Sequence, residues 1–390
     1  MNLFRIILTT LLLSLSTCLF AADDLMDAGR AASIDVVLEN AIRRGLISGG
    51  VVVVGNHSGH LYGTAHGRLF PDAGGPLLSD RTLFDTASLT KVIATAPAIM
   101  KLLEQGKLNL LDPLSHWFPE FEGTDREEIT ILNLLTHTSG LDDVDVAEND
   151  PLRRLIEKIV IQNNGALPGN RFRYADVNYI LLGELVRRIS QSTLDRFCTE
   201  NIYAPLGMAE TSFLPHSGFD VIAPTAGFNR ILTSGVVQDL NARRLGGVAG
   251  HAGLFSTASD LNRFAMMILN HGKYNGKQVF TERVITQMTS PYFYNNGKII
   301  RGLGWDISSP FSSPRGTYFS GMSFGHTGYS GSSIWIDPEQ DLYVILLTVR
   351  LDYTNIRQFS QLRSDISTLA VSIFSTSRKV AEIIDDLKIP

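Results

Sequence analysis

Two side chains, a serine and a lysine, have the types and spacing for nucleophilic catalysis. Ser88 and Lys91 form the only Ser-x-x-Lys sequence in the chain. On a helix, residues three positions apart share a face, which would bring the Lys91 amine beside the Ser88 hydroxyl. A serine hydroxyl is a poor nucleophile without an adjacent base, and a desolvated lysine can be that base. The pair therefore predicts a serine nucleophile activated by a lysine.

A second polar group comes later in the chain, at Tyr174 and Asp176. Both precede an apolar-periodic stretch that predicts a helix over residues 180–190, so Asp176 is positioned to cap that helix. Taken alone, Tyr174 would be interpreted as a packed core tyrosine. In a chain that also carries the Ser88 and Lys91 pair, its phenol becomes a candidate general acid or base.

A third polar group lies near the C-terminus, where Gly325–Gly331 separates two predicted strands, 317–324 and 332–337. The group consists of His326, Thr327, Gly328 and Tyr329. The backbone N–H that follows Gly328 could form an oxyanion hole together with that of Ser88. An unperturbed histidine titrates at about pH 6.5, so His326 would attract a substrate carboxylate mainly below that pH.

Two other stretches contain histidine. Residues 136–140 hold His137 and Ser139, and the favoured interpretation is a polar loop after a buried helix rather than a catalytic pair. The glycine-rich stretch 245–253 lacks the spacing of a phosphate loop and contains His251. For His251 two interpretations stay open: the ring lines a cleft, or it bonds to the backbone.

A buried helix is expected to carry the nucleophile. Apolar residues recur at helical spacing over residues 87–103, and Gly106 is expected to end the helix. Further elements are predicted on both sides of it: helices over 31–44, 151–162 and 358–374, and strands over 49–55, 60–67, 317–324, 332–337 and 342–347. Strands at both ends and helices between them indicate a sheet completed by both termini.

This pattern predicts an α/β (α+β) fold in one domain, residues 23–390. The sheet part is expected at about 31–85 and 290–375, and the helical and irregular part at about 107–289. Of the 390 residues, 44% are hydrophobic and 19% charged, which suits a globular enzyme with a sizeable core. The net charge is -5 and no basic stripe is present, so nucleic acid is not expected as a partner.

Residues 1–22 have the pattern of a secretory signal peptide. Arg5 precedes an apolar run over residues 6–15, and small residues lie before the acidic pair at 23–24. We therefore expect an exported, periplasmic protein. Membrane attachment through an uncleaved leader or a lipidated Cys18 is the alternative. Cleavage would leave Cys198 as the only cysteine, and no histidines show His-x-x-x-His spacing, so no metal or other cofactor is expected.

The order of the three polar groups resembles that of the serine β-lactamases and penicillin-binding proteins. The tyrosine-based second group is similar to the branch of class C β-lactamases and D-alanyl-D-alanine carboxypeptidases, which includes related esterases. The resemblance covers roughly residues 31–375. It implies a β-lactamase-like fold, in which an antiparallel sheet is flanked by helices and carries a mostly helical inserted subdomain.

The resemblance also implies roles for the residues. Ser88 would be the acylated nucleophile, Lys91 and Tyr174 would share the general-base role, and Tyr174 would protonate the leaving group. Asp176 would orient Lys91 or the substrate amide. Substrate binding would involve Asp176, His326, Thr327, Gly328 and Tyr329.

Two departures from the family pattern bear on the substrate. His326 stands where β-lactamases have lysine, and Asp176 stands where this branch often has asparagine. Both changes argue against an efficient cephalosporinase, because they weaken a fixed positive charge and add a negative one. The resemblance thus implies an exported serine hydrolase that acts through an acyl-enzyme on D-amino-acid peptides, β-lactams or esters. The expected partner is a small-molecule or peptidoglycan-derived substrate. The alternatives are a carboxylesterase for small acyl esters and a catalytically silent protein that binds peptidoglycan or β-lactams.

Overall fold

The structure is a computed structural model that describes residues 29–71, 75–162, 165–215, 221–226, 231–295 and 298–375. The predicted signal peptide over residues 1–22 and Cys18 lie outside the described residues. Within these ranges, no helix has both the length and the apolar character needed to cross a membrane.

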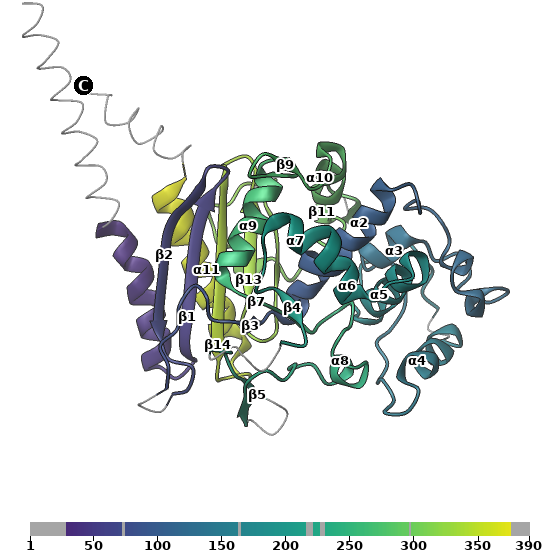
Figure 1. The fold of residues 1–390 in the computed structure, drawn as a ribbon, viewed down its shortest axis with the longest axis horizontal. Helices are drawn as coiled ribbons and strands as arrows, with labels where there is room; N and C mark the ends of the chain where they lie inside the picture. The colour runs from purple at the N-terminus through teal and green to yellow at the C-terminus, as the bar shows by residue number, and fades with distance from the viewer. Residues whose placement is uncertain are drawn as a thin grey trace, which may run out of the picture.

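Both ends of the chain build one five-stranded antiparallel sheet with the order β12-β13-β14-β1-β2 (Figure 1). The hairpin predicted near the N-terminus is present, and its first strand also pairs with the last strand of the chain. The strands are β1 (Ile47–Asn56), β2 (Gly59–Gly67), β12 (Phe324–Thr327), β13 (Ser333–Asp337) and β14 (Leu342–Arg350). The predicted α/β class with an antiparallel sheet is confirmed.

The strand predicted over 317–324 is wrong, because β12 begins only at Phe324. The preceding residues form turns that are held by side chains rather than by a strand ladder. Ser320 donates from its backbone N–H and its hydroxyl to the Asp337 carboxylate, at 2.7 and 2.8 Å. As a result, His326 lies inside a strand and not in the loop between strands.

Both faces of the sheet are buried at β1, which explains the continuous apolar run of this strand. Val51 and Val53 point into the core shared with the helical part of the molecule, whereas Val52 and Val54 belong to a second core. A helix over residues 29–43 and α11 (Ile356–Phe374) supply that second core. The successive side chains of a strand point to opposite faces, so every position of this stretch has to be apolar.

The helical part lies to one side of the sheet, and α9 (Ala258–Leu269) packs against β1 and β14 (Figure 1). Its other helices are α2 (Ala96–Glu104), α3 (Ile131–Leu135), α4 (Pro151–Val160), α5 (Val177–Ser190), α6 (Leu194–Cys198), α7 (Ala204–Leu206), α8 (Leu240–Arg244) and α10 (Glu282–Thr289). Short strands join these segments: β3 (Phe84–Asp85), β4 (Ser212–Phe213), β5 (Thr225–Ala226), β6 (Leu232–Thr233), β7 (Leu254–Ser256), β8 (Lys273–Tyr274), β9 (Lys277–Gln278), β10 (Phe293–Asn295) and β11 (Lys298–Arg301).

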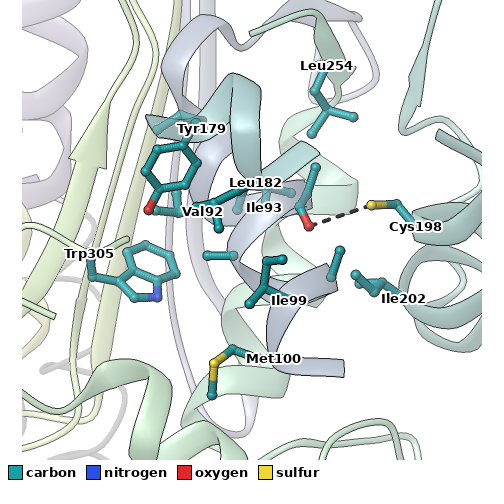
Figure 2. Close-up of a cluster of buried hydrophobic side chains, with 14 of the residues drawn as sticks. Val92, Ile93, Ile99, Met100, Tyr179, Leu182, Cys198, Ile202, Leu254 and Trp305 are labelled. Carbon is teal, nitrogen blue, oxygen red and sulfur yellow. Dashed lines mark hydrogen bonds between the residues drawn. The ribbon is translucent and has the colours of Figure 1, made fainter. Parts of the chain in front are cut away.

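The segment that carries Lys91 is anchored in the centre of the core. Figure 2 shows Val92, Ile93 and Ile99 of this segment among buried side chains of α5 and of the chain after α6. Cys198 also belongs to the cluster, and its Sγ lies 3.6 Å from the Ala94 carbonyl oxygen. This packing surrounds the segment and therefore holds the residues at its N-terminal end in fixed positions.

Candidate active site

Ser88 lies in a strained turn. The residue before it, Ala87, has a φ of 47°, in the left-handed region that residues other than glycine seldom adopt. Asp85, buried at the end of β3, accepts a hydrogen bond from the Ala87 N–H at 2.8 Å and so holds the turn. Strain of this kind costs about 1–3 kcal/mol and clusters at active sites. The turn therefore supports a functional role for Ser88.

The helix after Ser88 is not the regular α-helix that the periodicity predicts. A 3₁₀ turn (Ala87–Leu89) is followed by a π-helix (Lys91–Thr95), and α2 begins only at Ala96. Pro97 has no N–H with which to bond the Ile93 carbonyl in an α-helix. The Tyr203 hydroxyl lies 3.5 Å from that oxygen instead. Single π-turns are frequent at functional sites.

Lys91 is fully buried, and its ammonium group has three acceptors. Nζ lies 3.1 Å from Ser88 Oγ, 3.1 Å from the His251 carbonyl oxygen and 2.7 Å from Asp176 Oδ1. Burial lowers the Lys91 pKa, but the Asp176 carboxylate and Tyr174 outweigh burial, so the pKa is raised above its usual value. This contradicts the interpretation of Lys91 as a neutral base, because Asp176 holds it as an ammonium ion.

Asp176 does not cap the helix that it precedes. It occupies the N-cap position of α5, but its side chain accepts no capping hydrogen bond. Asp143 Oδ1 accepts from the Val177 N–H instead, at 3.0 Å, a role that the sequence did not reveal. Burial raises the Asp176 pKa, yet the positive charge of Lys91 lowers it below its usual value overall. The Asp176 carboxylate is therefore ionised beside Lys91.

Tyr174 stacks on His137, which lies in the turn after α3, as predicted, but is fully buried. Their ring centroids are 4.4 Å apart, and His137 Nδ1 accepts from the Ala175 N–H at 3.2 Å. Burial, together with the charges of Arg301 and Lys91, holds the His137 pKa well below its usual value. His137 is thus a neutral ring against which the Tyr174 ring packs. Its position directly after a buried helix was visible in the sequence, but its aromatic partner was not.

His326 is brought close to Tyr174, with 6.0 Å between the ring centroids. Its side chain is buried on β12, and its Nδ1 lies 2.9 Å from the Thr327 carbonyl oxygen. Burial and the charges of Arg301 and Lys91 hold the His326 pKa well below its usual value. The expectation that His326 titrates near its unperturbed pKa is therefore wrong, and this histidine is neutral.

The turn between β12 and β13 packs against the residues just before Ser88. Ser332 Oγ donates to the Thr86 carbonyl oxygen at 2.8 Å. Gly328 is required there, because a Cβ at this position would collide with that same Thr86 oxygen. The close approach places Tyr329 on the wall of the cleft that Ser88 also lines. The predicted oxyanion hole, formed by the backbone N–H groups of Ser88 and Tyr329, depends on this close approach of the two turns.

A cleft of about 350 Å³ brings the predicted residues together. Its lining includes Ser88, Tyr174, His326, Thr327, Gly328 and Tyr329. It also includes three arginines that the sequence analysis missed, Arg301, Arg350 and Arg363, which we call the arginine wall. These arginines come from three separate elements, so no local motif marks them. The one visible signal was an arginine that ends the largely apolar strand β14.

The arginine wall is short of negative charge. Its members are 1%, 4% and 8% exposed, and each has a buried guanidinium nitrogen without a hydrogen-bond partner in the described part of the chain. Asp306 is the only carboxylate among the residues that line this cleft, and it lies 3.8 Å from Arg301. Burial and the charge of Arg350 lower the Arg363 pKa to about 9. An anionic group in the cleft would relieve this unbalanced positive charge.

One group of side chains could hold a metal ion. Among the described residues, the ligand atoms of Asp176, Asp239 and His251 all lie within 4.8 Å of one another. His251 lines a second cavity, and its Nε2 is 2.9 Å from Asp239 Oδ1, which favours the cleft-lining interpretation. The three residues lie on separate segments, so a search for His-x-x-x-His spacing could not find them.

Comparisons with known proteins agree with this geometry. Residues 38–358 match the family model described as Beta-lactamase. A protein of Escherichia coli (strain K12), provisionally named D-alanyl-D-alanine carboxypeptidase, is 32% identical over 305 residues, which are 68% of this chain and 69% of that protein.

Solved structures share the fold. EstCE1, described as a hydrolase with promiscuous acyltransferase activity, has a TM-score of 0.72 at 21% identity, over 88% of this chain and 99% of its own. A β-lactamase/D-alanine carboxypeptidase from Pseudomonas syringae has a TM-score of 0.71 at 18% identity, over 88% of this chain and 98% of its own.

Proposed function

The chain belongs to the beta-lactamase family of serine hydrolases, and from this premise we propose that it removes a C-terminal D-amino acid from short peptides through an acyl-enzyme. One observation carries the choice of a carboxypeptidase over an esterase. The arginine wall lies in the same cleft as Ser88, so a leaving group that ends in a carboxylate would be attracted beside the nucleophile.

Ser88 is assigned as the nucleophile, and its Oγ attacks the carbonyl carbon of the scissile amide. Because Asp176 holds Lys91 as an ammonium ion, Lys91 donates a hydrogen bond to Oγ and cannot accept the hydroxyl proton. The proton is therefore assigned to Tyr174, which in this proposal enters the step as the phenolate and becomes the phenol on accepting it. The backbone N–H groups of Ser88 and Tyr329 are assigned to the developing oxyanion.

Breakdown of the tetrahedral intermediate breaks the C–N bond. Tyr174 returns its proton to the leaving nitrogen, and the D-amino acid departs as a free amine. A water molecule then attacks the ester carbon and passes a proton to Tyr174. The C–O bond to Ser88 breaks as that proton returns to Oγ, which restores the free enzyme.

Export is part of the proposal and is supported by the sequence alone. Residues 1–22 have the signal-peptide pattern, and peptides that end in D-amino acids are cell-wall material located outside the cytoplasmic membrane. We place the enzyme in the periplasm, either released after cleavage of the leader or held at the membrane by the leader or by a lipid on Cys18.

The direct test compares an N-acylated D-Ala-D-Ala peptide with the same peptide ending in a carboxamide. We expect kcat/KM to be about 10²-fold higher for the peptide with the free carboxylate. The carboxamide peptide carries no negative charge to pair with the arginine wall. Equal rates for the two peptides, together with faster cleavage of a p-nitrophenyl ester, would favour the carboxylesterase. Absence of both turnover and acylation would favour a silent binding protein.

Substitution of the most buried arginine tests the wall itself. Arg301→Gln should raise KM for the carboxylate peptide by about 10-fold while changing kcat/KM for a neutral ester by no more than about twofold. Arg81→Gln is the control, since this exposed arginine pairs with Glu210 and neither residue lines the cleft. An equal loss with both substrates in Arg301→Gln would mean that Arg301 supports the fold rather than the substrate.

The preference for acidic substrates should not depend on pH. His326 is neutral because its pKa lies well below the usual value, and the Arg363 pKa of about 9 lies above the pH range tested. The ratio of kcat/KM for the carboxylate peptide to that for a neutral ester should therefore vary by less than about twofold from about pH 5.5 to 8. A ratio that falls steadily as pH rises would mean that protonated His326, rather than the arginine wall, binds the substrate carboxylate.

A further inference from the structure

A second cavity meets the first at the nucleophile. Ser88, Tyr174 and Tyr329 line both cavities, but beyond these shared residues the two linings differ in charge. The first cavity has the arginine wall. The second has the carboxylates of Asp176 and Asp239, and we call it the acidic pocket.

Asp239 is a fixed anion in this pocket. It caps α8 by accepting from the Ala242 N–H at 2.7 Å, and its other close partner is His251 Nε2, at 2.9 Å. Burial raises its pKa, but the hydrogen bond and charge of His251 lower it to about 2 overall. The side chain is 31% exposed, so part of the carboxylate remains open to the cavity.

Apart from His251, the charged groups that the structure describes around the pocket give Asp239 no close cationic partner. Asp176 is neutralised by Lys91 at 2.7 Å. Arg243 lines the pocket, but its side chain is exposed to solvent. Asp85 lies behind the pocket, and its buried carboxylate accepts from the Gln238 N–H and adds no positive charge.

His251 provides a second, independent sign of a binding site. The ring lines the acidic pocket and is only 1% exposed. Its Nδ1 has no hydrogen-bond partner in the described part of the chain, although buried polar atoms are normally paired. A hydrogen-bonding ligand in the pocket would meet Asp239 and His251 together.

We infer that the acidic pocket binds an ammonium group carried by the acyl part of the substrate. This inference rests on the proposed function, because it needs the leaving carboxylate to occupy the arginine wall. Ser88 borders both cavities, so the two sides of the scissile amide have to extend into different ones. The preferred substrate is thus a short peptide with a carboxylate on the leaving side and a free ammonium group on the acyl side.

A divalent metal ion is the competing occupant, since the ligand atoms of Asp176, Asp239 and His251 lie close enough together to hold one. The Lys91 ammonium, 2.7 Å from Asp176, argues against it, because a dication would meet twice the repulsion that a monovalent ammonium meets. An ammonium group also donates hydrogen bonds, which the partly exposed Asp239 carboxylate can accept.

The test uses the full enzyme and two peptides, Lys-D-Ala-D-Ala with free amines and its diacetylated form. We expect wild-type kcat/KM to be about 10-fold higher for the free peptide, mainly through KM. Asp239→Asn should remove this preference, because asparagine keeps the cap of α8 but carries no charge. Asp150→Asn removes a remote exposed carboxylate and should retain the preference.

The outcomes separate the inference from the proposed function. If neither peptide releases D-alanine, the proposed function fails. If both are cleaved equally well by the wild type, only the ammonium pocket fails, and this comparison needs no variant. Inhibition by micromolar ZnCl₂ that Asp239→Asn abolishes, with no preference for the free amine, would assign the pocket to a metal ion and overturn the inference.

Discussion

Replacing Ser88 by alanine is expected to eliminate covalent labelling by a penicillin and to reduce peptide and ester hydrolysis by a factor on the order of 10⁶. The acyl-enzyme forms through the Ser88 oxygen, which alanine lacks. The free energy of unfolding should change by no more than about 1 kcal/mol, because Lys91 keeps the His251 carbonyl and Asp176 as acceptors. Intact-mass analysis after incubation with the penicillin measures the adduct.

Ser139→Ala is the matched control for this experiment. Ser139 is the serine beside His137 that the sequence offered as a second catalytic candidate, and its buried hydroxyl lies 2.5 Å from Asn178 Oδ1. The Ser139→Ala variant should keep the penicillin adduct. An adduct that survives in Ser88→Ala and disappears in Ser139→Ala would move the nucleophile and overturn the assigned mechanism.

Removing the Tyr174 hydroxyl should cause the second largest loss of catalytic rate. Tyr174→Phe is expected to slow acylation and deacylation by about 10²–10⁴-fold, the usual contribution of a general acid or base. The phenylalanine keeps the stacking on His137, so the loss isolates the hydroxyl. Single-turnover measurements with a chromogenic ester would resolve the two steps.

Tyr179→Phe controls for the loss of a phenol near Lys91. The Tyr179 ring centroid lies 5.8 Å from Lys91 Nζ, but its hydroxyl donates to the Leu135 carbonyl oxygen at 3.0 Å. This variant should lose about 1 kcal/mol of stability and keep its rates within a few-fold. Full activity in Tyr174→Phe would mean that Lys91 gives up its proton to Asp176 during turnover and acts as the base itself.

The charge state of the site explains why the Asp-for-Asn departure matters. With a carboxylate at 2.7 Å, the Lys91 pKa is raised rather than lowered, so proton transfer is assigned to Tyr174. The His-for-Lys departure at position 326 likewise does not leave the cleft without a cation. The arginine wall supplies three guanidinium groups there, on side chains that no resemblance had identified.

The sequence by itself determined the local features. Apolar periodicity predicted the hairpin of β1 and β2, the closing helix α11 and the end of α2 before Gly106, whose φ is 68°. Such features depend on hydrogen bonds and side-chain directions between near neighbours, which spacing encodes. The order of the three polar groups and the hydroxyl, amine and phenol that they carry were also readable from the sequence alone.

Only the tertiary structure decided how those groups are charged and what surrounds them. The neutrality of His326 and the ammonium form of Lys91 both depend on residues distant in the sequence, such as Arg301 and Asp176. Desolvation and Coulomb interactions vary with burial and with distances of a few ångströms, and sequence separation carries no information about either. For the same reason, the arginine wall and the acidic pocket become visible only when separate elements are packed around Ser88.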